Sequence, residues 1–149
     1  MRYRPYLPAD RAACLDILAS NLYRFFSPGD PDRYGDFLAR LQGFYGVVED
    51  GHGQVIGCGG YCIGGHVAVL TWGMVHAEFH RRGIGAFLLT ERLHRIAQDP
   101  GVETVVMNTA QPALGFYVRM GFAVVEHTRD GYATGLDRYD LELTLERSA

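Results

Sequence analysis

The sequence contains no lysine, few cysteines and no long apolar run. Its 14 basic residues are all arginine, and 17 acidic residues leave a net charge of −3 over 149 residues. The lack of lysine excludes a Walker A phosphate loop, which requires Gly-Lys-Ser/Thr. A charge this close to neutral argues against a surface that follows nucleic-acid phosphates, so we expect no nucleic-acid partner. No run approaches the roughly 18 apolar residues of a membrane-spanning helix, so we expect no membrane partner either.

The three cysteines are Cys14, Cys58 and Cys62. Their number is odd and their spacing fits no metal-ligand pattern, so we expect neither a disulfide framework nor a metal site. A free cysteine mostly behaves as a small hydrophobe, and buried free thiols are therefore the expected state.

The chain has the size and composition of one soluble domain. With 48% hydrophobic and 21% charged residues, 149 residues can bury a sizeable core, and we expect a single domain over 1–149 that is a monomer or a homodimer. The first residues, MRYRPYLPADR, lack the long apolar stretch of a secretory signal. This favours a cytoplasmic location.

The N-terminal third predicts one strand and two helices. Residues 2–6 are a short strand candidate, and Asp10 stands where a helix N-cap belongs. Apolar residues at helical spacing mark the first helix: Cys14, Ile17, Leu18 and Leu22. The breaker sequence 27–31 precedes a second amphipathic helix, ended by Gly43 and lined by Tyr34, Phe37, Leu38 and Leu41.

The middle of the chain changes to strand-like runs. Those at 44–49, 54–63 and 66–75 are separated by glycine-rich turns that favour antiparallel hairpins. A helix pattern follows from Gly83, and 104–109 is typical of a short buried strand. A strand–helix–strand crossover normally makes its two strands parallel.

The last third predicts a helix over about 112–120 and strands over 123–128 and 139–145. The whole order predicts an α/β fold with a mixed, mostly antiparallel twisted sheet of about seven strands and helices on both faces. The connection 129–138 is too glycine-rich to continue either strand and too long for a tight hairpin. We expect it to be an exposed, adjustable loop.

The most informative motif joins a strand to a helix and reads His80-Arg81-Arg82-Gly83-Ile84-Gly85-Ala86. The first N–H groups of a helix have no internal partner, and the helix dipole adds positive potential there. Gly83 and Gly85 let a phosphate approach the main chain, and Arg81 and Arg82 add charge beside it. A pyrophosphate would suit this site.

Spacing separates this motif from other phosphate binders. A Rossmann fingerprint is excluded because Leu88 stands at the third glycine position and several antiparallel strands precede the turn. The motif matches the R/Q-x-x-G-x-G/A acetyl-CoA signature, with His80 at the first position. Over nearly its whole length the chain resembles the GNAT superfamily of acetyltransferases. That resemblance implies acetyl-CoA as acyl donor, a GNAT-like fold, and cofactor contacts from Arg81, Arg82, Gly83, Ile84, Gly85 and Ala86.

A second segment, residues 113–122, is similar to the family's A-x-x-F-Y-x-x-x-G-F pattern. In that pattern the tyrosine points at the coenzyme sulfur, which makes Tyr117 the candidate general acid and Phe116 a cofactor neighbour. The chemistry asks for an acid because a departing thiolate is stabilised by a proton, and a phenol with a pKa of about 10 can supply it.

The resemblance places the acetyl group along the strand 72–75. In similar enzymes this strand splays from its parallel neighbour and donates an N–H to the thioester carbonyl, here from Met74 or Val75. The end of the opposite strand, with Thr109, forms the other side. In similar enzymes the connection between the last two strands borders the acceptor, so Asp130, Tyr132 and Asp137 could attract a cationic amine; alternatively, Asp137 pairs with Arg138 or caps the turn.

The predicted function is transfer of an acetyl group to a primary amine of a small molecule or peptide. No cysteine lies near the acetyl strand in sequence, so direct transfer in a ternary complex is expected. Two alternatives stay open: a non-catalytic acyl-CoA-binding sensor of the same fold, and an unrelated nucleotide-binding domain. The sequence identifies neither the acceptor nor the general base.

Overall fold

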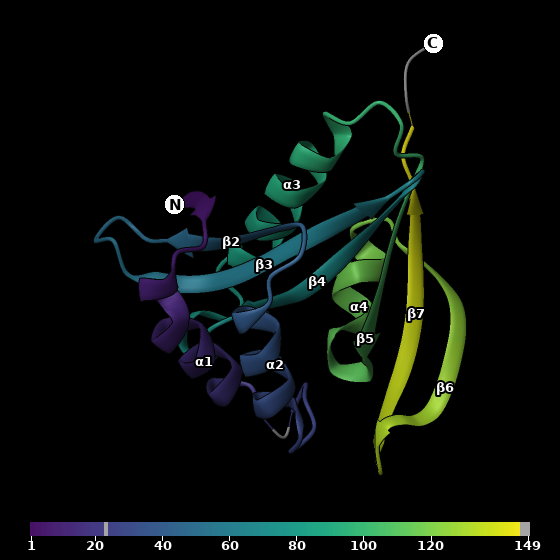
Figure 1. Cartoon of the computed structure of the whole chain (residues 1–149). Helices are drawn as coiled ribbons and strands as arrows, with labels where there is room; N and C mark the ends of the chain where they lie inside the picture. Colours follow the sequence, from purple (N-terminus) through teal and green to yellow (C-terminus); the bar gives the residue numbers. More distant parts are fainter. Residues whose placement is uncertain (23, 147–149) are drawn as a thin grey trace.

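A computed structural model describes residues 1–22 and 24–146. These residues form a seven-stranded mixed sheet with helices packed on it (Figure 1). The strand order is β1-β2-β3-β4-β5-β7-β6. The strands are β1 (Arg2–Pro5), β2 (Phe44–Glu49), β3 (Val55–Gly64), β4 (Val67–Val75), β5 (Thr104–Ala110), β6 (Ala123–Ala133) and β7 (Leu136–Thr144). Strands β4 and β5 pair in parallel and the other neighbours are antiparallel. The predicted fold class and crossover are confirmed.

Helices cover both faces of the sheet. Two lie on one face, α1 (Arg11–Ser20) and α2 (Asp30–Ala39), and two on the other, α3 (Ile84–Ala97) and α4 (Gln111–Arg119) (Figure 1). Short 3-10 turns at Pro8–Asp10 and Ala77–Phe79 precede α1 and follow β4. None of the helices in the described part of the chain is long and apolar enough to span a membrane.

The second helix is shorter than its apolar pattern predicts. It ends at Ala39, because Arg40 leaves helical geometry with φ −133° and ψ 44°. Leu41 consequently lies outside the helix and is 37% exposed. Asp10 does stand at the N-cap position of α1, as expected.

The expectation of a loop over 129–138 is wrong. β6 continues to Ala133, β7 begins at Leu136, and only two residues turn between them. The extra chain length is taken up by a bulge: between the pairs Thr128–Arg138 and Ala133–Leu136, β6 has four residues, 129–132, where β7 has one, Asp137.

Carboxylates hold this bulge in place of regular pairing. Asp130, with φ 52°, accepts a hydrogen bond from Gly135 N at 2.8 Å. Asp137 accepts from Asp130 N at 2.9 Å and pairs with His127 at 2.7 Å. These bonds satisfy the amides that a glycine-rich strand end would otherwise expose to solvent. The alternative that Asp137 caps the turn is therefore confirmed, and Arg138 pairs with Asp140 instead.

A small polar cluster joins β1 to the start of α1. The Asp10 carboxylate, 7% exposed, accepts two hydrogen bonds of 2.8 Å from the Arg4 guanidinium and one of 2.8 Å from Leu7 N. Arg4 also pairs with Glu49 on β2. The hydrogen bonds from Arg4 hold the pKa of Asp10 below its ordinary value.

We predict that Asp10→Asn destabilises the protein by about 1–3 kcal/mol at pH 7, because it removes charge-assisted hydrogen bonds. The folded pKa of Asp10 is depressed, so its contribution is complete above the unfolded pKa of about 4 and is lost as pH falls through the folded pKa. The gap in melting temperature between parent and variant should therefore close below about pH 4. Asp36→Asn, at an exposed position on α2, is the control; a gap that persisted at low pH would contradict the assignment.

Candidate active site

The strands β4 and β5 run side by side for only three residue pairs. Their ladder joins Val67–Val69 to residues 104–106 and then stops. Beyond that point β4 stays paired with β3, and β5 stays paired with β7, so the two strands diverge (Figure 1). Beyond the ladder, the facing edges of β4 and β5 make no backbone hydrogen bonds to each other.

The register of β4 decides which amide faces the open edge. His76 N donates to Ile56 O on β3 at 2.9 Å. Amides alternate in direction along a strand, so Met74 N–H also points to β3 and Val75 N–H points to the open edge. The Met74 side chain is 5% exposed in the core beneath α1 and α2. Of the two predicted donors, the geometry favours Val75.

A bulge in β4 lies just before this amide. Gly60 pairs with Thr71 and Cys58 with Met74, so Trp72 and Gly73 together oppose Gly59. Trp72 takes a left-handed conformation with φ 40°, which costs a bulky residue about 1–3 kcal/mol. The bulge redirects the strand where it leaves β5.

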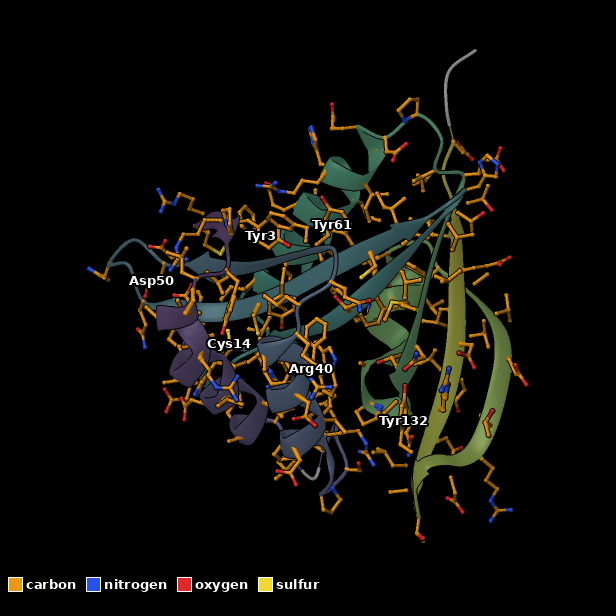
Figure 2. The ribbon with its side chains drawn as sticks, in the orientation of Figure 1. Tyr3, Cys14, Arg40, Asp50, Tyr61 and Tyr132 are labelled. Carbon is orange, nitrogen blue, oxygen red and sulfur yellow. The ribbon has the colours of Figure 1, made fainter. Side chains whose placement is uncertain are left out.

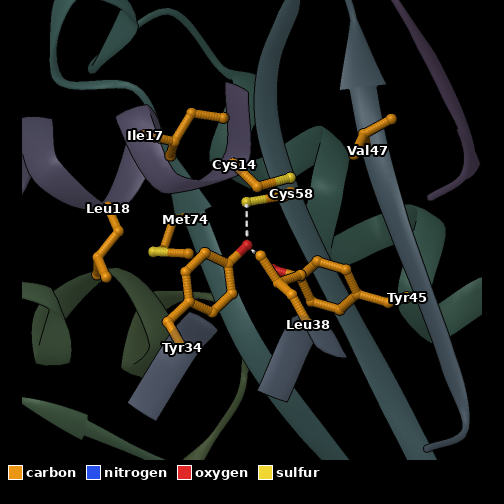
Figure 3. Close-up of a cluster of buried hydrophobic side chains, with 9 residues drawn as sticks. All are labelled: Cys14, Ile17, Leu18, Tyr34, Leu38, Tyr45, Val47, Cys58 and Met74. Atoms are coloured by element: carbon orange, nitrogen blue, oxygen red, sulfur yellow. Dashed lines mark hydrogen bonds between the residues drawn. The ribbon is translucent and has the colours of Figure 1, made fainter. Parts of the chain in front are cut away.

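Buried hydroxyl groups support the bulge from the α1–α2 face (Figure 3). Tyr45 donates to Trp72 O at 2.8 Å and bonds to the Tyr34 hydroxyl at 2.7 Å, and Tyr34 in turn lies 3.3 Å from Cys58 Sγ. Burial raises the pKa of both tyrosines, so both remain neutral hydrogen-bond donors. Cys14 and Cys58 are buried free thiols, as expected, and Cys62 is half-buried and free.

The turn before α3 presents an anion-binding geometry. Arg81 and Gly83 both have positive φ, 63° and 80°, and Gly83 is the N-cap. The first intrahelical bond runs from Phe87 N to Gly83 O, so the amides of Ile84, Gly85 and Ala86 precede it. Such consecutive amides form a concavity that suits an anion.

Side chains around the turn differ in their roles. Arg81 and Arg82 are exposed, and the Arg82 guanidinium lies 5.3 Å from the Phe79 ring centroid. The Ile84 side chain is 5% exposed in the core, so only its backbone can contact a ligand. His80 Nε2 donates to Val75 O at 2.8 Å, which ties the turn to the end of β4. This bond explains how histidine fits at a position where the family usually has Gln or Arg.

Gly85 brings β4, α3 and α4 together. A methyl group at Gly85 would lie 3.6 Å from Phe116 and 4.0 Å from Val75. Tyr117 follows, half-buried, with its ring 5.0 Å from that of Phe116 and 5.9 Å from that of Phe122. Within residues 1–22 and 24–146, no group hydrogen-bonds to the Tyr117 hydroxyl. The hydroxyl is therefore able to donate to a substrate.

The end of β5 is tied to the hairpin by hydrogen bonds that the sequence analysis did not predict. Thr109 lies beyond the end of the β4–β5 ladder, half-buried. Beside it, Asn108 accepts a hydrogen bond from Tyr132 of the hairpin. Figure 2 labels Tyr132. Gln111 bonds to Gly135 O at 2.7 Å and to Asp137 N at 2.8 Å, which fixes the hairpin turn to the start of α4. These bonds span 24 to 26 residues in sequence, so no local pattern could reveal them.

A model of the acetyltransferase (GNAT) domain matches residues 41–124. The chain belongs to the GNAT acetyltransferase family. The match covers β2 through the start of β6, and thus the splayed strands, the turn before α3, and α4. N-acetyl transfer is the activity that this family membership supports.

Individual proteins agree with that membership. Serotonin N-acetyltransferase of Macaca mulatta is 36% identical over 59 residues, which are 40% of this chain and 29% of that protein. The structure of the ribosomal-protein-S18-alanine N-acetyltransferase from Escherichia coli superposes with a TM-score of 0.78 at 20% identity, covering 99% of this chain and 96% of the other. An aminoglycoside 6′-N-acetyltransferase complexed with coenzyme A gives a TM-score of 0.75 at 12% identity, with both chains fully covered. At these identities the two structures show the fold alone.

We predict that Tyr45→Phe destabilises this GNAT domain by about 1–3 kcal/mol, because it leaves Trp72 O without its donor in a buried site. Urea denaturation should show a lower midpoint with an unchanged slope. Tyr139→Phe is the matched control: Tyr139 stacks on His127, and its loss of a hydroxyl should change stability by less than about 0.5 kcal/mol. Equal losses in the two variants would contradict a role for Tyr45 at the bulge.

Proposed function

We propose that the chain transfers an acetyl group from acetyl-CoA directly to a primary amine of a small molecule or peptide. The observation that carries the proposal is the position of the unpaired edge of β4 beside the amides that open α3. An extended thioester arm could pair with the first, and the pyrophosphate of the same coenzyme could lie against the second. Family membership and neighbours that act on amines support the acyl donor and the acceptor class.

The residues at the turn fit the coenzyme's phosphates. The turn offers the amides of Ile84, Gly85 and Ala86, with Arg81 and Arg82 as exposed cations. A Cβ at Gly83 would meet nothing within 4 Å, so space lies open in front of the turn. The coenzyme would supply an activated acetyl thioester, and the protein would supply its orientation.

Val75 and Tyr117 have separate tasks in the transfer. The Val75 amide would donate a hydrogen bond to the thioester oxygen as negative charge develops on that oxygen. As the new C–N bond forms and the C–S bond breaks, the Tyr117 hydroxyl would give its proton to the sulfur. The amine would release its own proton to solvent, and solvent would return a proton to the Tyr117 phenolate.

The cysteines favour direct transfer. Cys58 pairs with Met74, but it is fully buried and bonded to Tyr34. Cys14 is fully buried as well, and Cys62 donates to Gln42 O at 3.1 Å. A thiol that receives an acetyl group must reach the thioester, and these positions do not favour that.

The acceptor would approach past the hairpin tip. Asp137 uses both carboxylate oxygens within the hairpin, on Asp130 N and His127, whereas exposed Asp130 binds Gly135 N through one oxygen and would still attract a cationic amine. Tyr132 donates a hydrogen bond to Asn108 on β5, the strand that faces the open edge of β4. Burial raises the pKa of Tyr132 to about 12, so its phenol stays neutral and its ring can border an amine.

We predict that Gly83→Asp lowers acetyl-CoA affinity by about 10²-fold or more, since two like charges about 4 Å apart repel by several kcal/mol near a protein surface. Gly83→Asn has the same size without the charge, and both residues tolerate positive φ. Calorimetry should show the loss in Gly83→Asp and a much smaller one in Gly83→Asn, with unchanged circular dichroism. Equal acetyl-CoA affinities of the two variants would show that the phosphates do not bind at this turn.

We predict that Tyr117→Phe lowers turnover by about 10²- to 10⁴-fold, the range of a positioned acid, and leaves acetyl-CoA affinity within a few-fold. Thiol release from acetyl-CoA should first be measured over amino acids, polyamines, aminoglycosides and peptide N-termini to find an acceptor, with Tyr139→Phe as the control. Acetyl-CoA binding without turnover on any amine would favour the acyl-CoA sensor. Full turnover in Tyr117→Phe would assign that tyrosine to packing.

A further inference from the structure

Arg92 is a charged residue enclosed in the middle of α3. It is 2% exposed, among neighbours on the helix such as Leu88, Leu89 and Ile96 that form the apolar stripe. Among the residues that the structure describes, it makes one long hydrogen bond, of 3.5 Å from Nη1 to Gly60 O, and its Nε has no partner. Within the described ranges 1–22 and 24–146, no carboxylate lies within ion-pair distance of it.

Such an arrangement opposes stability. Burying a charge without a partner is unfavourable, and replacing a buried charged group by an apolar one of similar volume is often neutral or stabilising. A methionine or leucine at position 92 would extend the apolar stripe of α3. A residue that breaks a local rule without a compensating gain in stability points to a function.

The glycines around Arg92 locate that function. Methyl groups added at Gly59 and Gly73 would lie 3.3 Å from Nη1 and 2.7 Å from Nη2 of Arg92. The guanidinium thus fills the space that side chains would take at these two positions. Gly59 and Gly73 are the facing residues of the β3–β4 bulge, and Gly73 lies two residues before Val75.

The groups around the guanidinium are dipoles rather than acids. Gly59 O accepts a hydrogen bond of 2.6 Å from Tyr3, and Gly60 O faces Arg92 itself. Arg95, one turn further along α3, stands over the rings of Tyr3 and Phe44 at 5.4 and 4.3 Å. The charge of Arg92 is not neutralised locally, and in a medium of low dielectric its field extends to the neighbouring peptide groups of β4.

We propose that Arg92 is a positioning residue for acetyl transfer, which keeps the β4 bulge open through Gly59 and Gly73 and adds positive potential beneath the amides that face the thioester oxygen. The proposal rests on the proposed function. Arg92 acts through the β4 peptide groups. Preorganised positive potential there is most effective as negative charge develops on the thioester oxygen. A role in the transfer would then explain why this position holds a buried charge that lowers the stability of the protein.

The test compares Arg92→Met, which removes the charge at similar volume, with Arg92→Lys, which keeps it. Arg92→Met should melt at the parent's temperature or higher, bind acetyl-CoA within a few-fold, and lose about tenfold or more in kcat, part of what a direct oxyanion donor gives. Arg92→Lys should recover most of the kcat. Arg95→Met, which removes an arginine outside the bulge, should leave kcat unchanged.

A spectroscopic readout needs no acceptor. Acetyl-CoA labelled with carbon-13 at the thioester carbonyl should show a lower carbonyl stretching frequency when bound to the parent than when bound to Arg92→Met, because positive potential polarises the C=O bond. Identical frequencies, or a lower melting temperature with kcat reduced equally in Arg92→Met and Arg92→Lys, would overturn the inference alone. If the parent does not bind acetyl-CoA, the proposed function fails and the inference fails with it.

Discussion

The short ladder between β4 and β5 is the constraint on which the rest of the structure depends. Three pairs hold the two strands together, and each strand then follows its other neighbour. The sheet therefore consists of two sections, β1–β4 and β5–β7, joined at one end by this ladder. Helix α3 connects the other end of β4 to the start of β5. Eight residues join the end of β4 to the start of α3, and the bond from His80 to Val75 O ties this turn to β4, so the free amides of α3 lie near the open edge of β4. The topology alone, before any side chain is considered, therefore supports our proposal that a long ligand with a charged head binds here.

Both faces of β4 contribute to keeping the strand bent where the ladder ends. On the α1–α2 face, Tyr45 binds Trp72 O and is itself held by Tyr34. On the α3 face, Arg92 fills the space beside Gly73. The two supports differ in kind: the hydroxyl network is satisfied and stabilises the fold, whereas the guanidinium is poorly satisfied and opposes it. A bend with no role in function would need only the first.

Local patterns predicted the parts of the fold that local forces determine. The helix start at Gly83, the strand–helix–strand unit and the buried cysteines at 14 and 58 all follow from neighbouring residues and hydrophobic periodicity. The hairpin bulge was missed because Asp130 and Asp137 bond to amides five and seven residues away, which turns a glycine-rich stretch into strand. Distinguishing Val75 from Met74 required the register of β4 on β3, which is a tertiary property.

Backbone strain is likewise stabilised by local contacts at some residues and by tertiary contacts at others. Among the described residues, three non-glycine residues have positive φ: Trp72, Arg81 and Asp130. Asp130 is stabilised by its own carboxylate within the bulge, so its strain is compensated where it arises. Trp72 and Arg81 stand on either side of the Val75 amide, at the bulge and at the turn. Trp72 O is held by Tyr45 of β2, which is distant in sequence, and Arg81 lies two residues before the N-cap of α3. Strain on both sides of the Val75 amide marks residues 72–81 as the part of the molecule whose shape matters most for the transfer that we propose.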